Sequence, residues 1–515
     1  MSWEPEIAEL RRREALAQRM GGEEKVERQH SNGKLTVRER IDRLLDAGSF
    51  HEIGAIAGKA TYDDVGNLID LLPANFVMGR GRIDERPVVV GGDDFTVRGG
   101  AMDAAIGSKQ VFAEQMANEL EIPLVRLVDG TGGGGSVKTI EIDGRTYVPY
   151  NQGWDWVVDN LAKVPVVSLG LGSVAGLGST RLVSSHYSIM VRETSQMFIA
   201  GPALVARLGQ TFTKEELGGS EVHAKAGAID DVVDSEDEAF ARARRFLSYL
   251  PPNVFQLPPR SEPTDPSDRA DDWLIGAIPR DRRKVYDMRA ILRSVLDGDS
   301  FFEMGRRYGG STITGLARLD GWPVAIVASD PRVYGGGWTT DSAIKLTRFI
   351  DFAATFHLPV VNFTDVPGFV IGQQAEQAGT IRHGSRALAA LYQADVPWCT
   401  VIVRRAFGVA GAAHANHVRM HYRYAWPSAD WGSLPVEGGI EAAYRAELSE
   451  AQDPAAKLAE IEARLNVYRS PFRTADAFLA EEIIDPRHTR KLICEFANLA
   501  APLRRPGRNK NAFRP

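Results

Sequence analysis

The chain has 515 residues, of which 44% are hydrophobic and 25% are charged, and its formal net charge at pH 7 is −6. A typical domain has roughly 100–200 residues, so this length predicts at least two cores and the composition excludes a mainly disordered chain. The excess of acidic residues argues against a general nucleic-acid binder, which we would expect to be basic. Two cysteines, Cys399 and Cys494, are too few for a disulfide framework or a four-thiolate zinc site.

The first twenty residues carry charges throughout and lack the apolar stretch of a secretory signal. No run of about 18 apolar residues occurs anywhere in the chain, so we expect no membrane span. A cytoplasmic protein is the expectation that follows.

The sequence repeats itself at a distance of 236 residues. GRGRIDERPVVVGGDDFTVRGG (79–100) matches GLARLDGWPVAIVASDPRVYGG (315–336), and the same offset carries IPLVRLVD (122–129) onto LPVVNFTD (358–365). Several matches in one order predict two homologous domains, separated where PPNVFQLPPRSEPTDPSDRADD is rich in proline and charge. We therefore expect an N-terminal helical arm (1–29), a first domain (30–260), a linker (261–279), a second domain (280–503) and a basic tail (504–515).

The predicted elements come in the same order in each repeat. The apolar runs RPVVVGG (86–92) and WPVAIVA (322–328) predict buried strands. A pair of glycines follows each run, and then a helical stretch, at 103–120 in the first repeat and at 341–356 in the second. A second strand ends in Asp129 or Asp365. This order of strand, turn, helix and strand predicts α/β layering.

A glycine-rich loop follows a later strand in each half. GLGSVAGLGS (170–179) follows PVVSL, and GVAGAA (408–413) follows CTVIVRR. Backbone N–H groups in such loops can bind an anion, or an oxygen that becomes negative in a transition state. A tight turn or close helix packing would explain either loop alone, but two homologous loops suit a reaction with two developing oxyanions. A dinucleotide phosphate cradle fits less well, because no acidic residue stands about 20 positions further on after a second strand.

Histidine and aspartate residues near these loops have two interpretations each. His414, His417 and His421 could share one helical face, but a packed or solvated face is favoured over a ligand set and we predict no metal. Asp129 and Asp365 end their strands, where catalytic groups often lie in open α/β sheets, although each could equally cap the loop that follows.

Longer motifs connect the sequence to a known family. They stand in family order as KLTVRERIDRLLDAGSFHEIG (34–54), DFTVRGGAMDAAIGSK (94–109), ETSQMFIAGPALV (193–205), EELGGSEVHAKAGAID (215–230), FLSYLPPN (246–253), DVPGFVIGQQAEQAGTIRHG (365–384) and YAWPSAD (424–430). Over nearly its whole length the chain resembles the carboxyltransferase (β) subunits of biotin-dependent acyl-CoA carboxylases, above all the propionyl-CoA carboxylase type. The resemblance implies an α/β fold of two tandem crotonase-like ββα-superhelix domains.

The resemblance also implies the reaction. The chain would move a carboxyl group from carboxybiotin on a partner subunit to the α-carbon, or a vinylogous carbon, of an acyl-CoA. Backbone N–H groups would hold the two oxyanions, at Gly176 and Leu177 in the first half and at Val409 and Ala410, after Gly408, in the second. Acyl-CoA would bind mainly to the first domain and biotin to the second.

Further positions carry over from the family motifs to the two substrates. The residues expected near the acyl-CoA are Gly99, Gly100, Gly132, Gly133, Gly134, Gly411 and Ala412. Those expected on the biotin side are Gly335, Gly336, Asp365, Pro367, Gly368 and Phe369.

The sequence departs from the family pattern at several of these positions. Leu177 and Val409 stand where the family has glycine, and Gly411-Ala412 stand where the propionyl type has Tyr-Asp. GTGGGGSVK (130–138) replaces Gly-Gly-Gly-Ala-Arg. These differences lead us to hypothesise an unusual acyl group, bulkier or more polar than propionyl.

The resemblance also implies partners. No biotinylation motif and no ATP-grasp-like domain is present, so a biotin carboxylase/biotin carboxyl carrier (α) subunit would carry biotin and use ATP and bicarbonate. Family members build homohexamers as trimers of dimers, with each active site between two subunits. Neither nucleic acid nor membrane is expected as a partner.

Two alternatives remain open from the sequence. The first is the carboxyltransferase of a biotin-dependent decarboxylase or transcarboxylase, which would use the same fold. The second is a catalytically silent, crotonase-like scaffold subunit, motivated by Leu177, Val409 and the altered 130–150 loop.

Overall fold

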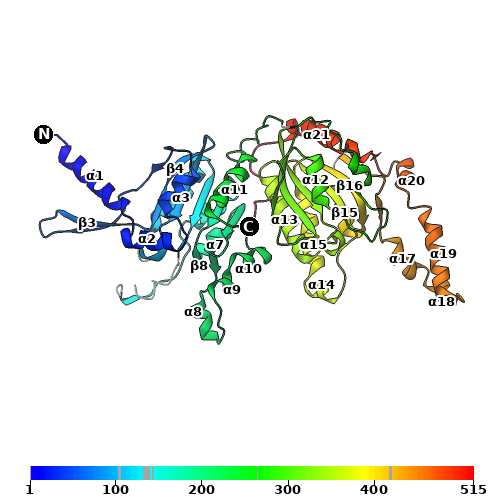
Figure 1. The fold of residues 1–515 in the computed structure, drawn as a ribbon, viewed down its shortest axis with the longest axis horizontal. Helices are drawn as coiled ribbons and strands as arrows, with labels where there is room; N and C mark the ends of the chain where they lie inside the picture. Colours follow the sequence, from blue (N-terminus) through cyan, green and yellow to red (C-terminus); the bar gives the residue numbers. More distant parts are fainter. Residues whose placement is uncertain are drawn as a thin grey trace. The chain divides into compact units, whose positions relative to one another are not determined.

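The computed structural model describes residues 2–101, 106–130, 140–141, 144–263, 265–416, 420 and 422–515. The chain forms two compact units, one of Met1–Gln256 with Ala512–Pro515 and one of Leu257–Asn511. Each unit contains one large mixed sheet that is packed against helices (Figure 1). Within the described residues, no helix has both the length and the apolar character that a membrane crossing requires.

The sheet of the first unit has seven strands in the order β1-β4-β5-β6-β7-β9-β11. The first three are antiparallel and the rest run parallel. Its strands are β1 (His51–Glu52), β4 (Phe76–Ile83), β5 (Arg86–Asp93), β6 (Leu124–Val128), β7 (Val166–Gly170), β9 (Tyr187–Val191) and β11 (Asp231–Val233). Two small sheets accompany it, made of β2 (Gly58–Tyr62) with β3 (Leu68–Pro73) and of β8 (Ser173–Ala175) with β10 (Gln196–Phe198).

The sheet of the second unit has the same plan, in the order β12-β13-β14-β15-β16-β17-β19, and β18 adds to β16. It too begins with three antiparallel strands and continues with parallel ones. Its strands are β12 (Phe302–Met304), β13 (Thr312–Leu319), β14 (Trp322–Ser329), β15 (Val360–Val366), β16 (Trp398–Phe407), β17 (Tyr422–Ala425), β18 (Asp430–Gly432) and β19 (Glu482–Ile483).

Helices connect the strands and cover the sheets. Among the described residues of the first unit they are α1 (Glu4–Gln18), α2 (Glu23–Ser31), α3 (Val37–Leu44), α4 (Gly107–Leu120), α6 (Trp154–Asn160), α7 (Leu177–Val183), α8 (Pro202–Val205), α9 (Lys214–Gly218), α10 (Ser220–Lys225) and α11 (Glu236–Ser248). In the second they are α12 (Met288–Val295), α13 (Thr340–Thr355), α14 (Gln373–Gln377), α15 (Thr380–Gln393), α16 (Gly408–Ala412), α17 (Val436–Ala443), α18 (Arg445–Glu450), α19 (Pro454–Asn466), α20 (Pro471–Asp476) and α21 (Thr489–Ala500).

The burial of the strands explains their composition. Every residue of β6, β7 and β15 is buried, because layers cover both faces of a parallel sheet and favour unbroken apolar runs. In α12, Met288, Ile291, Leu292 and Val295 form the buried stripe expected of an amphipathic helix. The predicted strands at 86–92, 122–129, 322–328 and 358–365 are confirmed as β5, β6, β14 and β15.

The repeat is also visible in the backbone. A set of left-handed residues recurs 236 positions later: Asp84, Arg98, Gly99, Gly100 and Glu121 correspond to Asp320, Tyr334, Gly335, Gly336 and His357. The φ angles agree closely, at 64° for Gly99 and 61° for Gly335. The two units therefore share their turns as well as their strand order.

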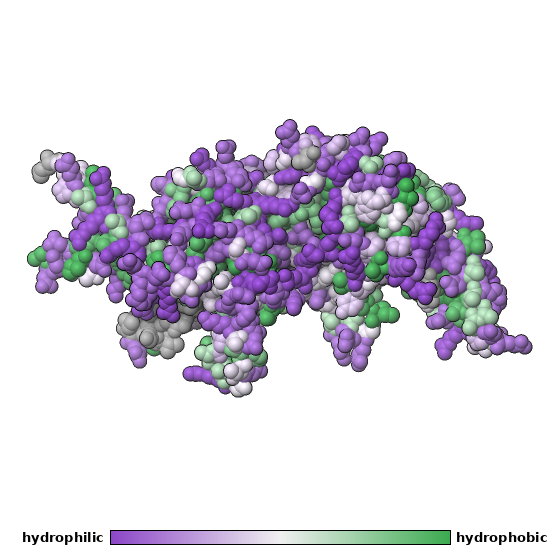
Figure 2. All heavy atoms as spheres, in the orientation of Figure 1, coloured by the Kyte–Doolittle hydropathy of each residue, from purple (hydrophilic) through white to green (hydrophobic). Residues whose placement is uncertain are grey.

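Apolar side chains are exposed on segments that project from each unit (Figure 2). Beside α8, Ile199 and Leu208 are 101% and 78% exposed. In the second unit, exposed residues near α19 and α20 include Tyr468, Phe472, Phe478 and Leu479. Apolar patches of this kind mark association surfaces in many proteins.

Candidate active site

A glycine at the equivalent corner of each unit turns a strand into a short helix. Gly176 lies before α7 with φ 60° and ψ −121°, and Gly408 begins α16 with φ 61°. Only glycine adopts this backbone region without strain. The residues that follow, Leu177 and Val409, do not have positive φ, so the corner requires glycine at one position and accepts other residues at the next.

The corners expose backbone donors. Within the described part of the chain, the N–H groups of Leu177, Val409 and Ala410 have no backbone or side-chain acceptor. They belong to the first turns of α7 and α16, where helical N–H groups lack internal partners. The N–H group of Gly176 instead donates to the Phe198 carbonyl at 3.2 Å. Of the first predicted pair, Leu177 is thus the residue whose donor is available.

The first unit brings three glycine segments together. A Cβ atom at Gly100 would lie 2.7 Å from the Gly130 Cα, and one at Gly178 would lie 3.8 Å from the Gly130 carbonyl oxygen. The Arg98–Gly100 turn, the start of the 130–138 loop and α7 therefore meet at one place. Gly99 has open space around it, with only the Phe95 ring 3.9 Å from a built Cβ. Gly132, Gly133 and Gly134 lie outside the described residues.

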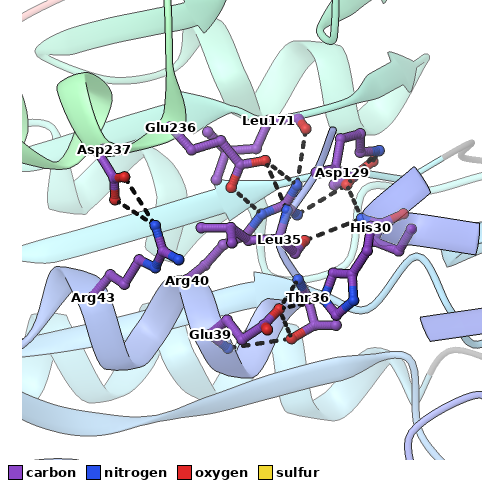
Figure 3. A network of polar contacts seen from close by, with 12 residues as sticks. His30, Leu35, Thr36, Glu39, Arg40, Arg43, Asp129, Leu171, Glu236 and Asp237 are labelled. Carbon is purple, nitrogen blue, oxygen red and sulfur yellow. Dashed lines mark hydrogen bonds and ion pairs between the residues drawn. The ribbon is translucent and has the colours of Figure 1, made fainter. Parts of the chain in front are cut away.

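Asp129 ends β6 beside these segments and is fully buried in a polar network (Figure 3). Its carboxylate accepts from Lys34 Nζ at 2.8 Å and from Arg40 Nη1 at 2.9 Å. Arg40 also pairs with both oxygens of Glu236 at 2.8 Å and donates to the Leu171 carbonyl at 3.0 Å. The network ties the end of β6 to the segment that leads into the Gly176 corner.

Position 172 requires glycine, because the network leaves no room for a side chain there. A Cβ atom there would lie 1.8 Å from Asp129 Oδ1 and 2.6 Å from Lys34 Nζ. The glycine therefore lets the backbone before the corner lie directly against the paired carboxylate.

A second carboxyl group, Asp93, lies at the end of β5. It accepts hydrogen bonds from the Asp129 N–H at 3.1 Å and from Gln110 Nε2 at 3.3 Å. Burial raises its pKa above the ordinary value, so its neutral form is favoured relative to an exposed aspartate. No sequence pattern distinguishes Asp93 from the adjacent Asp94, so the sequence analysis did not single it out.

The second unit collects its predicted residues in the same way. A Cβ atom at Gly336 would lie 2.3 Å from the Asp365 carbonyl oxygen, and one at Gly368 would lie 3.8 Å from that of Phe407. The Trp338 N–H donates to the Gly368 carbonyl at 3.0 Å. Phe369 packs edge-on against the Trp338 ring, with centroids 5.9 Å apart.

Asp365 is fully buried and its carboxylate is saturated by donors. Tyr286 donates to Oδ2 at 2.9 Å, Arg404 pairs with Oδ2 at 2.9 Å, and Arg405 Nε donates to Oδ1 at 2.7 Å. Burial alone would raise the pKa of Asp365, but the Arg405 and Arg404 cations hold it below its ordinary value. Asp365 is therefore ionised at neutral pH and fixed in place.

These counter-ions were missed by the sequence reasoning. Arg404 and Arg405 end the apolar run CTVIV, and charges there within a buried strand are a usable signal. Arg40 precedes Asp129 by 89 residues, and no sequence motif connects the two. No spacing rule would have found that pair.

The remaining predicted positions are placed as follows. Gly411 is buried and Ala412 is exposed, both within α16, and Pro367 is half-buried. His414 Nδ1 donates to the Gly411 carbonyl at 2.8 Å, which makes it a packing residue of the corner. His417 and His421 lie outside the described residues, and no group of three or more potential metal ligands occurs among the residues that are described.

Comparison with known proteins decides the family. Residues 28–512 match the family model described as carboxyl transferase domain. The chain belongs to the carboxyl transferase family. It is 35% identical over 505 residues to the propionyl-CoA carboxylase carboxyltransferase subunit of Haloferax mediterranei, covering 97% of each chain. It is 33% identical over 518 residues to the methylmalonyl-CoA carboxyltransferase 12S subunit of Propionibacterium freudenreichii subsp. shermanii, covering 99% of this chain and 97% of the relative.

A solved structure agrees with these relatives. The transcarboxylase 12S hexamer, crystallised with hydrolysed methylmalonyl-coenzyme A, superposes with a TM-score of 0.88 at 32% identity, covering 99% of each chain. The predicted fold of two crotonase-like α/β domains is confirmed. The chain is a carboxyltransferase of the kind used by biotin-dependent acyl-CoA carboxylases, as the sequence resemblance implied.

Proposed function

We propose that the chain moves a carboxyl group from carboxybiotin, carried by a partner subunit, to the α-carbon or a vinylogous carbon of an acyl-CoA, and that the two glycine corners bind the oxyanions. The supporting observation is the set of N–H groups at Leu177, Val409 and Ala410 that have no acceptor among the described residues. Removal of an α-proton places negative charge on the thioester oxygen. Fixed donors aimed at such an oxygen lower the barrier because they need no reorganisation.

The proposal assigns the corner at Gly176 and Leu177 to the thioester oxygen, and the corner at Val409 and Ala410 to the ureido oxygen of biotin. Carboxybiotin would supply the carboxyl group as CO2, and the ureido nitrogen that CO2 leaves would accept the α-proton before the enolate carbon attacks CO2. This chain supplies donors and positioning, and its buried carboxylates Asp129 and Asp365 are occupied by cations. No side chain of the chain then has to titrate during the reaction.

We assign the remaining predicted residues to the same two sides. Gly99, Gly100 and the 130–138 loop belong to the acyl-CoA side, and Gly335, Gly336 and the Asp365–Phe369 segment to the biotin side. Asp365 acts as a positioning residue, because the partners of its carboxylate among the described residues are Tyr286, Arg404 and Arg405.

The acyl group is proposed to be larger or more polar than propionyl. Gly411 and Ala412, which the family resemblance places near the acyl group, have less side-chain volume than the Tyr-Asp of the propionyl type, and the relatives act on propionyl-CoA or methylmalonyl-CoA by name. Competition among acetyl-, propionyl-, longer-chain and hydroxylated acyl-CoA esters tests this. Highest kcat/KM for propionyl-CoA would contradict it.

We further propose a cytoplasmic homohexamer, a trimer of dimers, that works with a biotin-bearing α subunit, which consumes ATP and bicarbonate. The related 12S protein forms a hexamer, and the apolar projections near α8 and α20 offer surface to such an assembly. Purification from the native cell followed by streptavidin blotting tests the partner. Absence of any biotinylated chain at stoichiometric level would contradict the proposal.

The oxyanion assignment is tested by Leu177→Pro and Leu177→Ala. Proline is tolerated at the first position of a helix, so Leu177→Pro removes one N–H donor while α7 can still form. Leu177→Ala removes the side chain and keeps the donor. We expect Leu177→Pro to lower kcat by ~10²–10³-fold, as for other oxyanion donors, and Leu177→Ala to lower it far less.

The assay is carboxyl transfer to biotin methyl ester by the full-length protein, from the carboxylated form of the acyl-CoA that the competition experiment selects, with acyl-CoA affinity measured separately. Equal losses in the two variants would show that the side chain, and not the N–H group, matters at position 177.

A further inference from the structure

The guanidinium of Arg405 has one arm that the fold does not use. Nε donates to Asp365 Oδ1 at 2.7 Å, and Nη2 donates to the Gly335 carbonyl at 2.5 Å and to Asp365 Oδ2 at 3.2 Å. Among the described residues, Nη1 has no hydrogen-bond acceptor. The side chain is 21% exposed, and a Cβ at Gly335 would lie 3.6 Å from Nη1. The free arm therefore lies at the surface of the Tyr334–Gly336 turn.

Its neighbour Arg404 also pairs with Asp365 but is more deeply buried. Arg404 donates through Nε to Asp365 at 3.1 Å and through Nη1 to the Lys284 carbonyl at 2.9 Å. Its Nη2 pairs with Asp365 at 2.9 Å, and its side chain is only 5% exposed. The guanidinium also lies over the Tyr286 ring, 4.8 Å from the centroid. All three guanidinium nitrogens of Arg404 thus have partners within the second unit.

The charges of these three groups do not cancel. Two guanidinium cations face one carboxylate, Asp365, and Arg404 already neutralises it from the buried side. The remaining positive charge belongs to Arg405, the more exposed cation. Because Asp365 and the Gly335 carbonyl fix Nε and Nη2, the free arm is held in one orientation. A preorganised guanidinium edge is a good binding site for a planar carboxylate.

We propose that Arg405 binds the carboxylate of carboxybiotin through Nη1. The inference rests on the biotin side proposed above, since Arg405 lies between the Gly335 turn and the Gly408 corner on β16. Carboxybiotin has an anionic carboxylate attached to its ureido nitrogen, whereas the ureido ring of free biotin is neutral. Arg405 therefore distinguishes the loaded from the unloaded carrier: it holds the donor before transfer and lets the discharged biotin leave.

Binding of two stable biotin derivatives to the full-length protein tests this. One is the ureido-N-carboxymethyl derivative of biotin methyl ester, which keeps an anion near the ureido ring, and the other is its neutral ureido-N-methyl counterpart. Isothermal titration calorimetry gives both dissociation constants. We expect the wild-type protein to bind the anionic compound about tenfold more tightly, as one charge-assisted hydrogen bond would give.

Three variants separate the roles of charge and geometry. Arg405→Met should remove the preference, and Arg405→Lys should keep only part of it, because lysine has one amine in place of a two-armed fork. Arg293→Met removes an equally cationic but 65% exposed side chain from α12 and should behave as wild type. Arg405→Met should remain folded, since Asp365 keeps Arg404, Tyr286 and the Arg405 N–H; thermal unfolding checks this.

A second readout distinguishes binding from structure. In transfer assays, Arg405→Met should raise KM for the carboxylated carrier and leave KM for acyl-CoA unchanged. An unaltered preference in Arg405→Met, or a preference abolished by coenzyme A as a competing anion, overturns the assignment. If neither derivative binds the wild-type protein while acyl-CoA does, the biotin side itself is misplaced, and the inference falls with it.

Discussion

The turns that carry Gly99-Gly100 and Gly335-Gly336 allow a sharp test of why glycine occurs in pairs. Gly335 and Gly336 both have positive φ, 61° and 85°. A Cβ at Gly336 would lie 2.3 Å from the Asp365 carbonyl oxygen, whereas one at Gly335 would meet only the Arg405 guanidinium at 3.6 Å. Alanine at either position destabilises the fold by about 1–2 kcal/mol, because a residue with a Cβ is strained in the left-handed region. Only Gly336→Ala also forces a backbone carbonyl to move, because a Cβ cannot lie 2.3 Å from a carbonyl oxygen.

The displaced carbonyl belongs to a residue that cannot move freely, because Asp365 is buried and its side chain is ion-paired. Forced overpacking of this kind costs about 1–3 kcal/mol. Gly336→Ala should therefore destabilise the second unit by about 1–3 kcal/mol more than Gly335→Ala. For a unit of this size that corresponds to a further fall in Tm of about 2–4 °C for each kcal/mol.

Scanning calorimetry and native-state hydrogen exchange of peptides from β15 measure the difference. Faster exchange at the end of β15 is expected for Gly336→Ala alone. The first unit offers a repeat of the experiment, since a Cβ at Gly100 would lie 2.7 Å from the Gly130 Cα, and one at Gly99 meets only a ring at 3.9 Å. Equal effects within each pair would refute the steric explanation.

Three further outcomes follow from the structure. Arg40→Met should cost about 3–5 kcal/mol in urea unfolding because it leaves buried Glu236 without its cation and Asp129 with Lys34 alone, whereas Arg43→Met, which breaks an exposed pair, should cost less than about 1 kcal/mol. Burial alone would raise the pKa of Glu114, but Arg126 and its neighbour Arg181 lower it to about 2 from 4.5, so its contribution to stability is complete above pH 4.5 and is lost as pH falls towards 2. Acid unfolding of Glu114→Gln should accordingly be flatter between those pH values, and an unchanged slope would contradict the ion pair. Val409→Gly keeps the N–H group and should change kcat less than about tenfold, which a larger loss in steady-state transfer assays would disprove.

The sequence predicts the strands and turns of this fold well because they depend on local patterns. Buried parallel strands read as unbroken apolar runs, and the glycine pairs mark left-handed turns that recur 236 residues apart. The partners of Asp129 and Asp365 follow no such pattern. The repeat makes the two aspartates equivalent, yet Asp129 is paired by Lys34 and Arg40 from the segment before the sheet, and Asp365 by two arginines of the next strand.

The two homologous units therefore differ in where the cations around this aspartate come from and in how exposed those cations are. In the first unit the cations come from the N-terminal segment and are enclosed, with Lys34 9% and Arg40 1% exposed. In the second unit the cations come from β16 itself, so the strand that leads into the Gly408 corner also carries the partly exposed guanidinium of Arg405. A neutral thioester needs only the donors of a corner, whereas an anionic carboxyl carrier gains from a nearby cation. The placement of the counter-ions thus supports acyl-CoA on the first unit and carboxybiotin on the second.

The substitutions at positions 177 and 409 follow from the same geometry. A run of two glycines suggests that both residues need unusual backbone conformations, but only Gly176 and Gly408 have positive φ. The donors lie one position later, in ordinary helical backbone, where any residue except proline carries an N–H group. Leucine and valine can therefore occupy these positions without loss of the donor, and their side chains become free to vary with the acyl group and carrier that the site accepts.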